Sequence, residues 1–200
     1  MILFYTPNSP YARTARIALR EWGLLAITEE RLADNREAHN PVLEFSPVGR
    51  VPTLVHNGMV ITEACNVFAY IKHLASAADT NFIAKADWTT VVQEGQISGF
   101  LEGIAFWVRE KRRAPQEQSD FLLSVERDRT LRCLNYFDTL STNGSLPTIS
   151  EFRAAALACA LHLMDMHHFI PNWRMEYSTL AKWFQKQTDR PSMQETLVFN

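Results

Sequence analysis

The 200-residue sequence has few cysteines and no long hydrophobic segment. Its three cysteines, Cys65, Cys133 and Cys159, are odd in number and far apart, which favours reduced thiols over a disulfide framework. The longest apolar run, residues 154–161, is much shorter than the roughly 20 residues that span a bilayer. No basic segment followed by an apolar one opens the chain, so we expect no signal peptide. These absences predict a soluble, cytoplasmic protein with no membrane partner.

A large excess of charge of either sign is also missing. The 20 Lys and Arg residues are interspersed with 22 Asp and Glu residues, and a net charge of −2 gives no reason to expect a nucleic-acid partner. Neither a G-x-G-x-x-G nor a Walker phosphate loop is present, so nucleotide binding has no support. The histidines at 162, 167 and 168, with Asp165, match no zinc-ligand spacing, and we expect no metal.

Short strand patterns alternate with helical ones in the first 75 residues. Residues 2–5 are apolar on both faces, which is typical of a buried strand, and residues 25–32 are a second strand candidate. Between them, apolar residues at 15, 18, 19 and 22 repeat with helical spacing as far as Gly23. Asn57-Gly58 between two apolar runs indicates a hairpin, and another helical pattern covers residues 64–74. This order predicts an α/β domain with a mixed sheet in residues 1–76.

The rest of the sequence has helical patterns without strand patterns. They cover residues 87–113, 116–140, 149–167 and 177–188. We therefore predict a linker at residues 77–86 and an all-helical domain in residues 87–200. Thr148 and Glu151 have the spacing of a capping box, which predicts where the third of these helices begins.

Three segments of the first domain, taken in order, resemble a known family. They are SPYAR at 9–13, FSPVGRVPTL at 45–54 and ITEACNVFAYI at 61–71. Together they resemble the thioredoxin-like half of bacterial, serine-type glutathione S-transferases, and the helical second half extends the resemblance over the whole chain. The resemblance implies an α/β thioredoxin-like N-terminal domain followed by an all-α helical-bundle domain. Ser9 and Ala12 stand where thioredoxins have C-x-x-C, so dithiol exchange at this place is excluded.

Ser9 has two interpretations. Followed by Pro10, it is typical of an ordinary helix N-cap. The resemblance implies instead that its hydroxyl is the catalytic group and donates a hydrogen bond to the thiolate of bound glutathione. Lowering a thiol pKa by two units requires roughly 2.7 kcal/mol. One hydrogen bond to a charged acceptor supplies about 1.5–3 kcal/mol and the helix N-terminus about 0.3–1 kcal/mol, which is sufficient. Tyr5 is the rival hydroxyl, but its place in an apolar strand favours core packing.

The resemblance also implies where glutathione, the co-substrate, binds. Arg50 would face the glycyl carboxylate, although a solvated surface arginine is an equal alternative. A cis Val51–Pro52 bond would free the Val51 backbone to pair with the cysteinyl part. Glu63 and Ala64 match a Glu-Ser pair that holds the γ-glutamyl end at the start of a helix. Because alanine replaces that serine, one hydrogen bond of about 0.5–1.5 kcal/mol is missing, and we expect weaker glutathione affinity.

Glycines at positions 95, 99 and 103 recur every four residues within a helical pattern, where each costs about 1 kcal/mol relative to alanine. They indicate either a closely packed neighbouring helix or a cleft beside the thioredoxin-like domain. Aromatic residues near them, with one tyrosine near Ser9, would line an apolar site for the acceptor substrate. These residues are Phe100, Phe106, Trp107 and Tyr11. Core or dimer packing is the alternative for the aromatics of the helical domain.

The sequence therefore predicts a cytoplasmic glutathione transferase, homodimeric by family analogy, that acts in detoxification. It would join glutathione to small apolar electrophiles. The alternative is a non-catalytic binding or regulatory protein of the same fold, which Ala64 keeps open.

Overall fold

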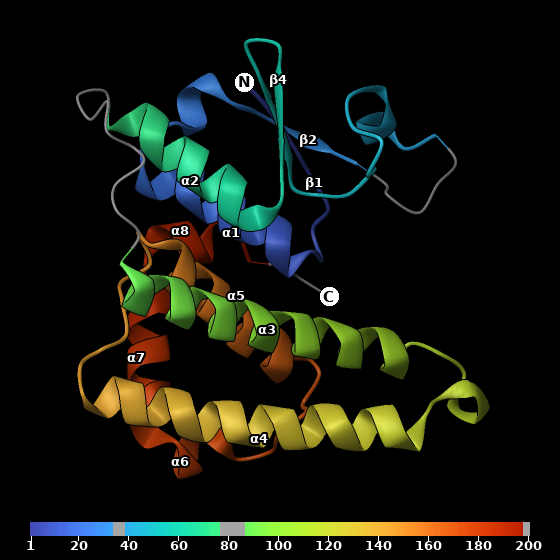
Figure 1. Cartoon of the computed structure of the whole chain (residues 1–200), viewed down its shortest axis with the longest axis vertical. Coiled ribbons are helices and arrows are strands. Elements are labelled where there is room, and N and C mark those ends of the chain that lie inside the picture. The colour runs from blue at the N-terminus through green and yellow to red at the C-terminus, as the bar shows by residue number, and fades with distance from the viewer. Residues whose placement is uncertain (34–38, 77–86, 198–200) are drawn as a thin grey trace. The chain divides into compact units, whose positions relative to one another are not determined.

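The computed structural model describes residues 1–33, 39–76 and 87–197, and Figure 1 shows the elements they form. The chain divides into two compact units. Unit 1 comprises Met1–Ala86 with Pro191–Asn200, and unit 2 comprises Asp87–Arg190. The predicted linker at 77–86 lies outside the described residues. The expected order, an α/β domain followed by a helical one, is confirmed.

Unit 1 contains a four-stranded mixed sheet with the strand order β2-β1-β3-β4. The strands are β1 (Ile2–Tyr5), β2 (Glu29–Leu32), β3 (Thr53–His56) and β4 (Met59–Thr62). Strand β1 runs parallel to β2, with Ile2 opposite Glu29, and antiparallel to β3, with Leu3 opposite Leu54. Both Leu3 and Leu54 are fully buried, as expected for central strands whose faces are covered.

The second strand is shorter than the sequence predicts. Residues 25–27 form a 3-10 turn, η1 (Leu25–Ile27), and β2 begins only at Glu29. The Thr28 hydroxyl donates a hydrogen bond to the Leu24 carbonyl at 2.8 Å, and this local bond favours a turn over an extended strand.

The hairpin at Asn57-Gly58 is confirmed. Asn57 has a φ of 49° and Gly58 a φ of 77°, the positive values that a tight two-residue hairpin requires at both positions. Strands β3 and β4 pair directly on either side, with His56 opposite Met59.

Helices α1 (Pro10–Glu21) and α2 (Ala64–Ala75) complete unit 1 and pack against each other. Another 3-10 turn, η2 (Pro41–Glu44), precedes β3. The buried core includes Phe4 from β1, Ile17 from α1 and Phe68 from α2.

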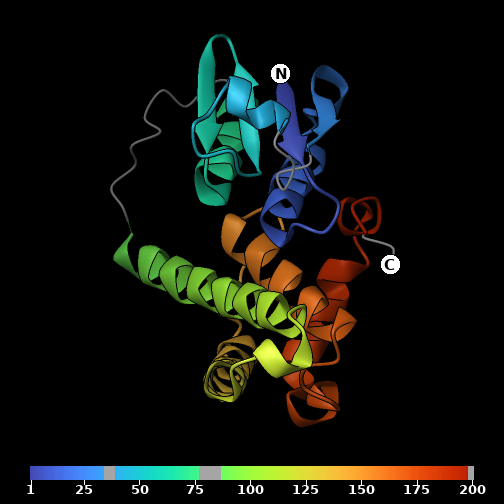
Figure 2. The same ribbon diagram turned by 90° about the vertical axis from the view of Figure 1, so that its right-hand side faces the viewer.

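The C-terminal residues pack with unit 1, so the helical domain predicted for residues 87–200 ends earlier, at Arg190. Figure 2 shows the short helix α8 (Pro191–Gln194), in red, beside α1. The buried Arg13 guanidinium donates hydrogen bonds to the Met193 carbonyl at 3.0 Å and to Thr196 Oγ1 at 3.3 Å. Arg20 of α1 adds an ion pair with Glu195 at 3.1 Å. No local sequence pattern encodes these contacts, because they join residues about 180 positions apart.

Unit 2 is helical in its described residues. It contains α3 (Trp88–Lys111), a turn η3 (Pro115–Glu117), α4 (Asp120–Thr142), α5 (Phe152–Met166), α6 (Trp173–Glu176) and α7 (Ser178–Thr188). In Figure 2, α3 runs across the view and α4 is seen nearly end-on beside it. Helix α5 is apolar all round and residues 154–161 are fully or almost fully buried, which explains the long apolar run in the sequence. Among the helices of the described residues, none is long and apolar enough to cross a bilayer.

The predicted capping box is wrong. Helix α5 begins at Phe152, and Glu151 makes no side-chain capping bond. The Thr148 hydroxyl pairs with Ser150 Oγ at 3.0 Å instead. The Glu151 carboxylate instead accepts a hydrogen bond from the Arg153 guanidinium at 2.5 Å, in which both partners are charged.

Candidate functional site

Ser9 is the N-cap of α1. Its backbone is extended, with φ −86° and ψ 113°, and its Oγ accepts a hydrogen bond from the Ala12 N–H at 3.1 Å. The capping role is therefore confirmed. A hydroxyl also carries one hydrogen to donate, and no hydrogen bond donated by Ser9 is found among the described residues. The same atom can cap its helix and still donate to an anion at the helix N-terminus.

The Val51–Pro52 peptide bond is cis, as the resemblance implies. Val51 and Pro52 are buried, whereas Arg50 is exposed. The Thr53 hydroxyl donates to the Arg50 carbonyl at 2.7 Å, which fixes the backbone on either side of the cis bond.

Asn40 supports this loop, and the sequence reasoning missed it. Its side chain is buried, donates to the Gly49 carbonyl at 2.7 Å and accepts from the Val42 N–H at 3.0 Å. Gly49 has a φ of 60°, and a Cβ there would lie 2.8 Å from a methyl carbon of Leu43. The Asn-Pro dipeptide at 40–41, which favours a turn, is the sequence signal that could have found Asn40.

Glu63 and Ala64 lie at the start of α2. Glu63 has a φ of 65°, a strained conformation for a residue with a side chain, and its exposed side chain makes no capping hydrogen bond. Such strain costs on the order of 1–3 kcal/mol and tends to occur at functional sites. Ala64 is 7% exposed and is the first helical residue. No side chain caps the amides at this helix start, which suits a carboxylate ligand.

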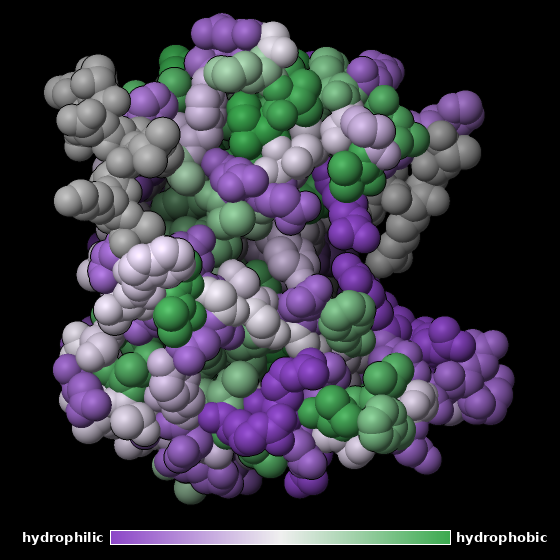
Figure 3. Space-filling model, viewed as in Figure 1, coloured by the Kyte–Doolittle hydropathy of each residue, from purple (hydrophilic) through white to green (hydrophobic). Residues whose placement is uncertain are grey.

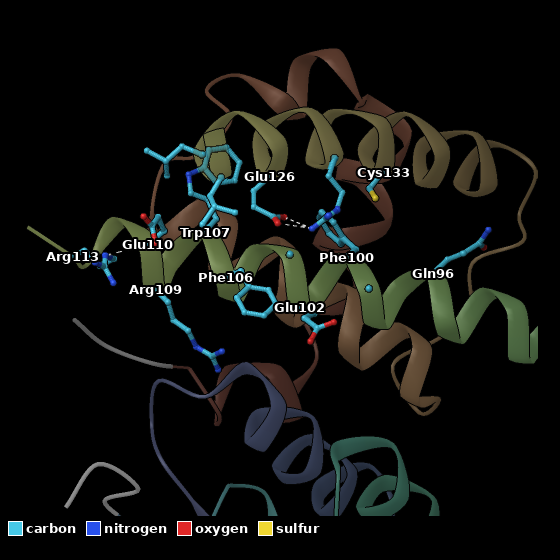
Figure 4. A pocket seen from close by; sticks show the side chains of 15 residues that line it. Gln96, Phe100, Glu102, Phe106, Trp107, Arg109, Glu110, Arg113, Glu126 and Cys133 are labelled. Carbon is cyan, nitrogen blue, oxygen red and sulfur yellow. Dashed lines mark hydrogen bonds and ion pairs between the residues drawn. The ribbon is translucent and has the colours of Figure 1, made fainter. Parts of the chain in front are cut away.

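In unit 2, a pocket of about 770 Å³ lies between α3 and α4 (Figure 4). It brings together Phe100, Phe106 and Trp107, three of the four residues predicted to hold an acceptor. Phe100 is 2% exposed and packs on Phe137 with ring centres 5.5 Å apart. Trp107 is 5% exposed and stacks on Phe169 at 4.2 Å. The core-packing interpretation therefore holds for both, and their pocket-facing surfaces are small.

Phe106 and Tyr11 differ from those two. Phe106 is 48% exposed, so it offers a ligand more surface than Phe100 or Trp107. Tyr11 is half-buried in the first turn of α1 and belongs to unit 1 rather than to the pocket between α3 and α4.

The glycine stripe of α3 serves two purposes. A Cβ at Gly103 would lie 2.7 Å from Glu126 Oε2, so a close approach of α4 requires glycine there. A Cβ at Gly95 or Gly99 would have nothing within 4 Å, and Gly99 leaves open space in the pocket. The close-packing interpretation therefore holds at Gly103, whereas Gly99 lines the pocket between α3 and α4, and a cleft beside the thioredoxin-like domain stays a prediction.

A buried carboxylate in the pocket was missed by the sequence reasoning. Glu126 is 7% exposed and accepts hydrogen bonds from Arg129 at 2.5 and 2.6 Å (Figure 4). The spacing of three residues in a helix is the sequence signal for this pair. Burial raises the pKa of the Cys133 thiol, also in the pocket, which keeps it protonated and unreactive near neutral pH.

The face of the molecule seen in Figure 3 has hydrophilic and hydrophobic residues side by side over α3 and α4.

Within the described residues, no three His, Cys, Asp or Glu side chains gather as a metal site would require.

Comparison with known proteins gives a consistent result. Residues 3–79 match the family model of the glutathione S-transferase N-terminal domain. The chain is 27% identical over 195 residues to the uncharacterized GST-like protein YibF of Escherichia coli K12, an alignment that covers 94% of each chain. A glutathione transferase family member from Pseudomonas fluorescens Pf-5, solved with bound S-(propanoic acid)-glutathione, is 25% identical, with a TM-score of 0.81 and 100% of both chains covered. A structure of a Pseudomonas fluorescens Pf-5 family member with bound glutathione has a TM-score of 0.83 at 23% identity, covering 100% of this chain and 99% of that chain. Residues 3–79 therefore carry the glutathione S-transferase N-terminal domain, and the chain has the fold of glutathione S-transferases, with a thioredoxin-like unit and a helical one.

Proposed function

We propose that this protein is a glutathione transferase that binds glutathione in unit 1 and joins its sulfur to small apolar electrophiles held in the pocket between α3 and α4. The observation that carries the proposal is Ser9. Its hydroxyl lies at the N-terminus of α1 with its oxygen accepting from Ala12 N–H, and its hydrogen can rotate to donate to a second acceptor.

The reaction requires a thiolate. The glutathione thiol releases its proton to solvent, the Ser9 hydroxyl donates to the sulfur anion, and the sulfur forms a bond to the electrophilic carbon as the leaving group departs. A two-unit fall in thiol pKa raises the thiolate fraction roughly 25-fold at pH 7. Its lower basicity reduces reactivity about six- to tenfold, so holding the acceptor in place supplies most of the rate.

The rest of the tripeptide has matching groups in unit 1. The Val51 backbone, beside the cis bond, would pair with the cysteinyl part, and exposed Arg50 would pair with the glycyl carboxylate. Glu63 would bind the γ-glutamyl amine, and the amides at the start of α2, from Ala64 onward, its carboxylate. A Pseudomonas fluorescens relative solved with bound glutathione supports glutathione as the ligand of this fold.

Three further properties belong to this proposal. We expect a homodimer acting in detoxification, and exposed apolar side chains such as Trp88, Val92 and Phe121 offer surface for association. Light scattering of the purified protein measures the mass of the assembly and so tests the homodimer. The three free cysteines support a reducing compartment such as the cytoplasm.

Two measurements together distinguish a transferase from a non-catalytic binding protein of the same fold. The first is retention on immobilised glutathione, and the second is turnover of 1-chloro-2,4-dinitrobenzene with glutathione. We expect both, with turnover lost in Ser9→Ala. Retention without turnover, unchanged by Ser9→Ala, would identify a binding or regulatory protein.

A further inference from the structure

The pocket between α3 and α4 is lined by three arginines and three glutamates, and two of each neutralise one another. Arg129 bonds to the buried Glu126 at 2.5 Å. Arg113 lies 3.9 Å from Glu110, whose carboxylate also accepts from the Ser119 N–H at 2.6 Å. These four side chains are therefore satisfied before any ligand arrives.

Arg109 has no ion pair among the described residues, and its side chain is exposed in the pocket. Its guanidinium carbon lies over the Phe106 ring, 5.6 Å from the ring centre. This cation–π contact holds the guanidinium against the half-exposed ring. The pocket thus presents an unpaired cation directly beside its most accessible aromatic surface.

Glu102 is the pocket's other charged group without an ion pair among the described residues. It precedes Phe106 by four positions and Arg109 by seven, so all three lie on one face of α3. Figure 4 shows them projecting from the same side of the helix. Seven residues span roughly 10 Å of helix, which places the negative charge at one end of this row and the positive charge at the other.

We infer that the pocket takes an aromatic electrophile that carries a carboxylate, with its ring on Phe106 and its carboxylate paired with Arg109. This inference rests on the proposed transferase function and replaces its wholly apolar acceptor with an aromatic one that also carries an anionic group. The planar guanidinium matches a carboxylate with two parallel hydrogen bonds, which a neutral acceptor cannot form. Glu102 repels a ligand whose carboxylate lies at the Glu102 end of the pocket. The charges of Glu102 and Arg109 therefore fix the direction in which the ligand binds.

The chemistry of such an acceptor leaves the carboxylate unchanged. With an aryl chloride, the glutathione sulfur forms a bond to the ring carbon, and chloride leaves with the electrons of the broken carbon–chlorine bond. The thiol proton has already gone to solvent. Arg109 therefore binds and orients the acceptor and takes no part in bond making.

The experiment compares 4-chloro-3-nitrobenzoate with its uncharged isostere 4-chloro-3-nitrobenzamide. We measure kcat/KM with glutathione for the wild type, Arg109→Gln, Arg109→Lys and the control Arg112→Gln. Arg112 is an exposed arginine on the same turn that does not line the pocket. Its replacement removes the same net charge.

The wild type is expected to prefer the benzoate at least tenfold over the benzamide, after correction for their uncatalysed rates. Arg109→Gln should abolish that preference, a tenfold loss equivalent to about 1.4 kcal/mol, while Arg112→Gln keeps it. Arg109→Lys should retain part of it, because the charge remains without the guanidinium geometry. Equal use of both acceptors by the wild type, or a preference that survives Arg109→Gln, would overturn the inference and leave the transferase function intact.

A binding measurement separates this inference from the proposed function. Calorimetry without glutathione compares 3-nitrobenzoate with 3-nitrobenzamide, neither of which has a leaving group. Tighter binding of the acid that disappears in Arg109→Gln supports the site even if no turnover is found. Failure of both compounds to bind, or equal binding of the two, would contradict it.

Discussion

The carboxylate of Glu126 occupies the space that a side chain at Gly103 would need, with Oε2 only 2.7 Å from the position of its Cβ. Because that carboxylate is buried and held by Arg129, it has little freedom to move aside. Gly103 therefore fixes the distance between the two helices that line the pocket.

Replacing Gly103 by alanine tests this relationship, with Gly99→Ala as the matched control. Alanine gains up to about 1 kcal/mol of helix propensity at either position. At Gly103 this gain is offset by overpacking of about 1–3 kcal/mol. We expect Gly99→Ala to raise the urea midpoint of unit 2 above that of the wild type. The midpoint of Gly103→Ala should be lower than that of Gly99→Ala. Equal midpoints would show that Glu126 moves freely.

Arg13→Met should detach the C-terminal segment from α1. The change removes the two hydrogen bonds that the charged guanidinium donates to the Met193 carbonyl and the Thr196 hydroxyl, at about 1.5–3 kcal/mol each. Urea unfolding should show a lower midpoint for unit 1, and limited proteolysis should cleave within residues 191–197 faster than in the wild type. Combining Arg13→Met with Thr196→Val should cost less than the sum of the single changes, because the two side chains share one contact. Strict additivity would contradict the contact.

Glu30 makes the stability of unit 1 depend on pH. Burial raises the pKa of its carboxyl, but hydrogen bonds from Arg20 and Arg16 lower it more, so the pKa lies below its ordinary value. A depressed folded-state pKa gives stability that is present above the unfolded value near 4.3 and is lost as pH falls through the folded value. The free energy of unfolding should therefore fall below about pH 5. Glu30→Gln should be less stable at pH 7, and its free energy of unfolding should change less with pH over that range. An unchanged pH dependence would exclude Glu30 as the cause.

Ala64→Ser should restore the hydrogen bond that alanine lacks at the start of α2. A gain of about 0.5–1.5 kcal/mol corresponds to roughly 2- to 10-fold tighter glutathione binding by calorimetry. Ala69→Ser, in the middle of the same helix, is the control and should leave the affinity unchanged. If both variants bind as the wild type does, the γ-glutamyl end does not lie at Ala64.

Local signals in the sequence predicted the fold well where the chemistry is local. The Asn57-Gly58 hairpin follows from two residues that tolerate positive φ, and its outcome does not depend on the rest of the chain. The capping box failed because Arg153, two residues along the chain, binds the Glu151 carboxylate, and the distant Gln93 of α3 holds Arg153 in place by accepting a second hydrogen bond from it. The sequence also does not predict that residues 191–197 pack on α1, because this contact depends on the buried Arg13, whose partners lie about 180 positions away.

The candidate site shows the same limit. Ser9 was identified from the strand-to-helix junction, yet capping and donation involve the same hydroxyl and give the same sequence pattern. An Asn-Pro dipeptide signals a turn at Asn40 and the spacing of Glu126 to Arg129 signals an ion pair, but composition and spacing do not reveal that Asn40 and Glu126 are buried.

The capping and thiolate roles of Ser9 can be separated by a matched variant. Ser119 caps α4 as Ser9 caps α1, accepting from the Leu122 N–H at 3.3 Å. Both Ser9→Ala and Ser119→Ala should lower stability by about 0.5–2 kcal/mol through loss of a cap. Only Ser9→Ala should also change the pKa of the bound glutathione thiol.

The most direct measurement is the pKa of the thiol of enzyme-bound glutathione, titrated by thiolate absorbance near 240 nm in the wild type, Ser9→Ala and Ser119→Ala. The account predicts that the wild type and Ser119→Ala lower this pKa by about two units from the free value near 8.5, and that Ser9→Ala returns most of that shift. Bound glutathione with the same thiol pKa in wild type and Ser9→Ala would contradict it.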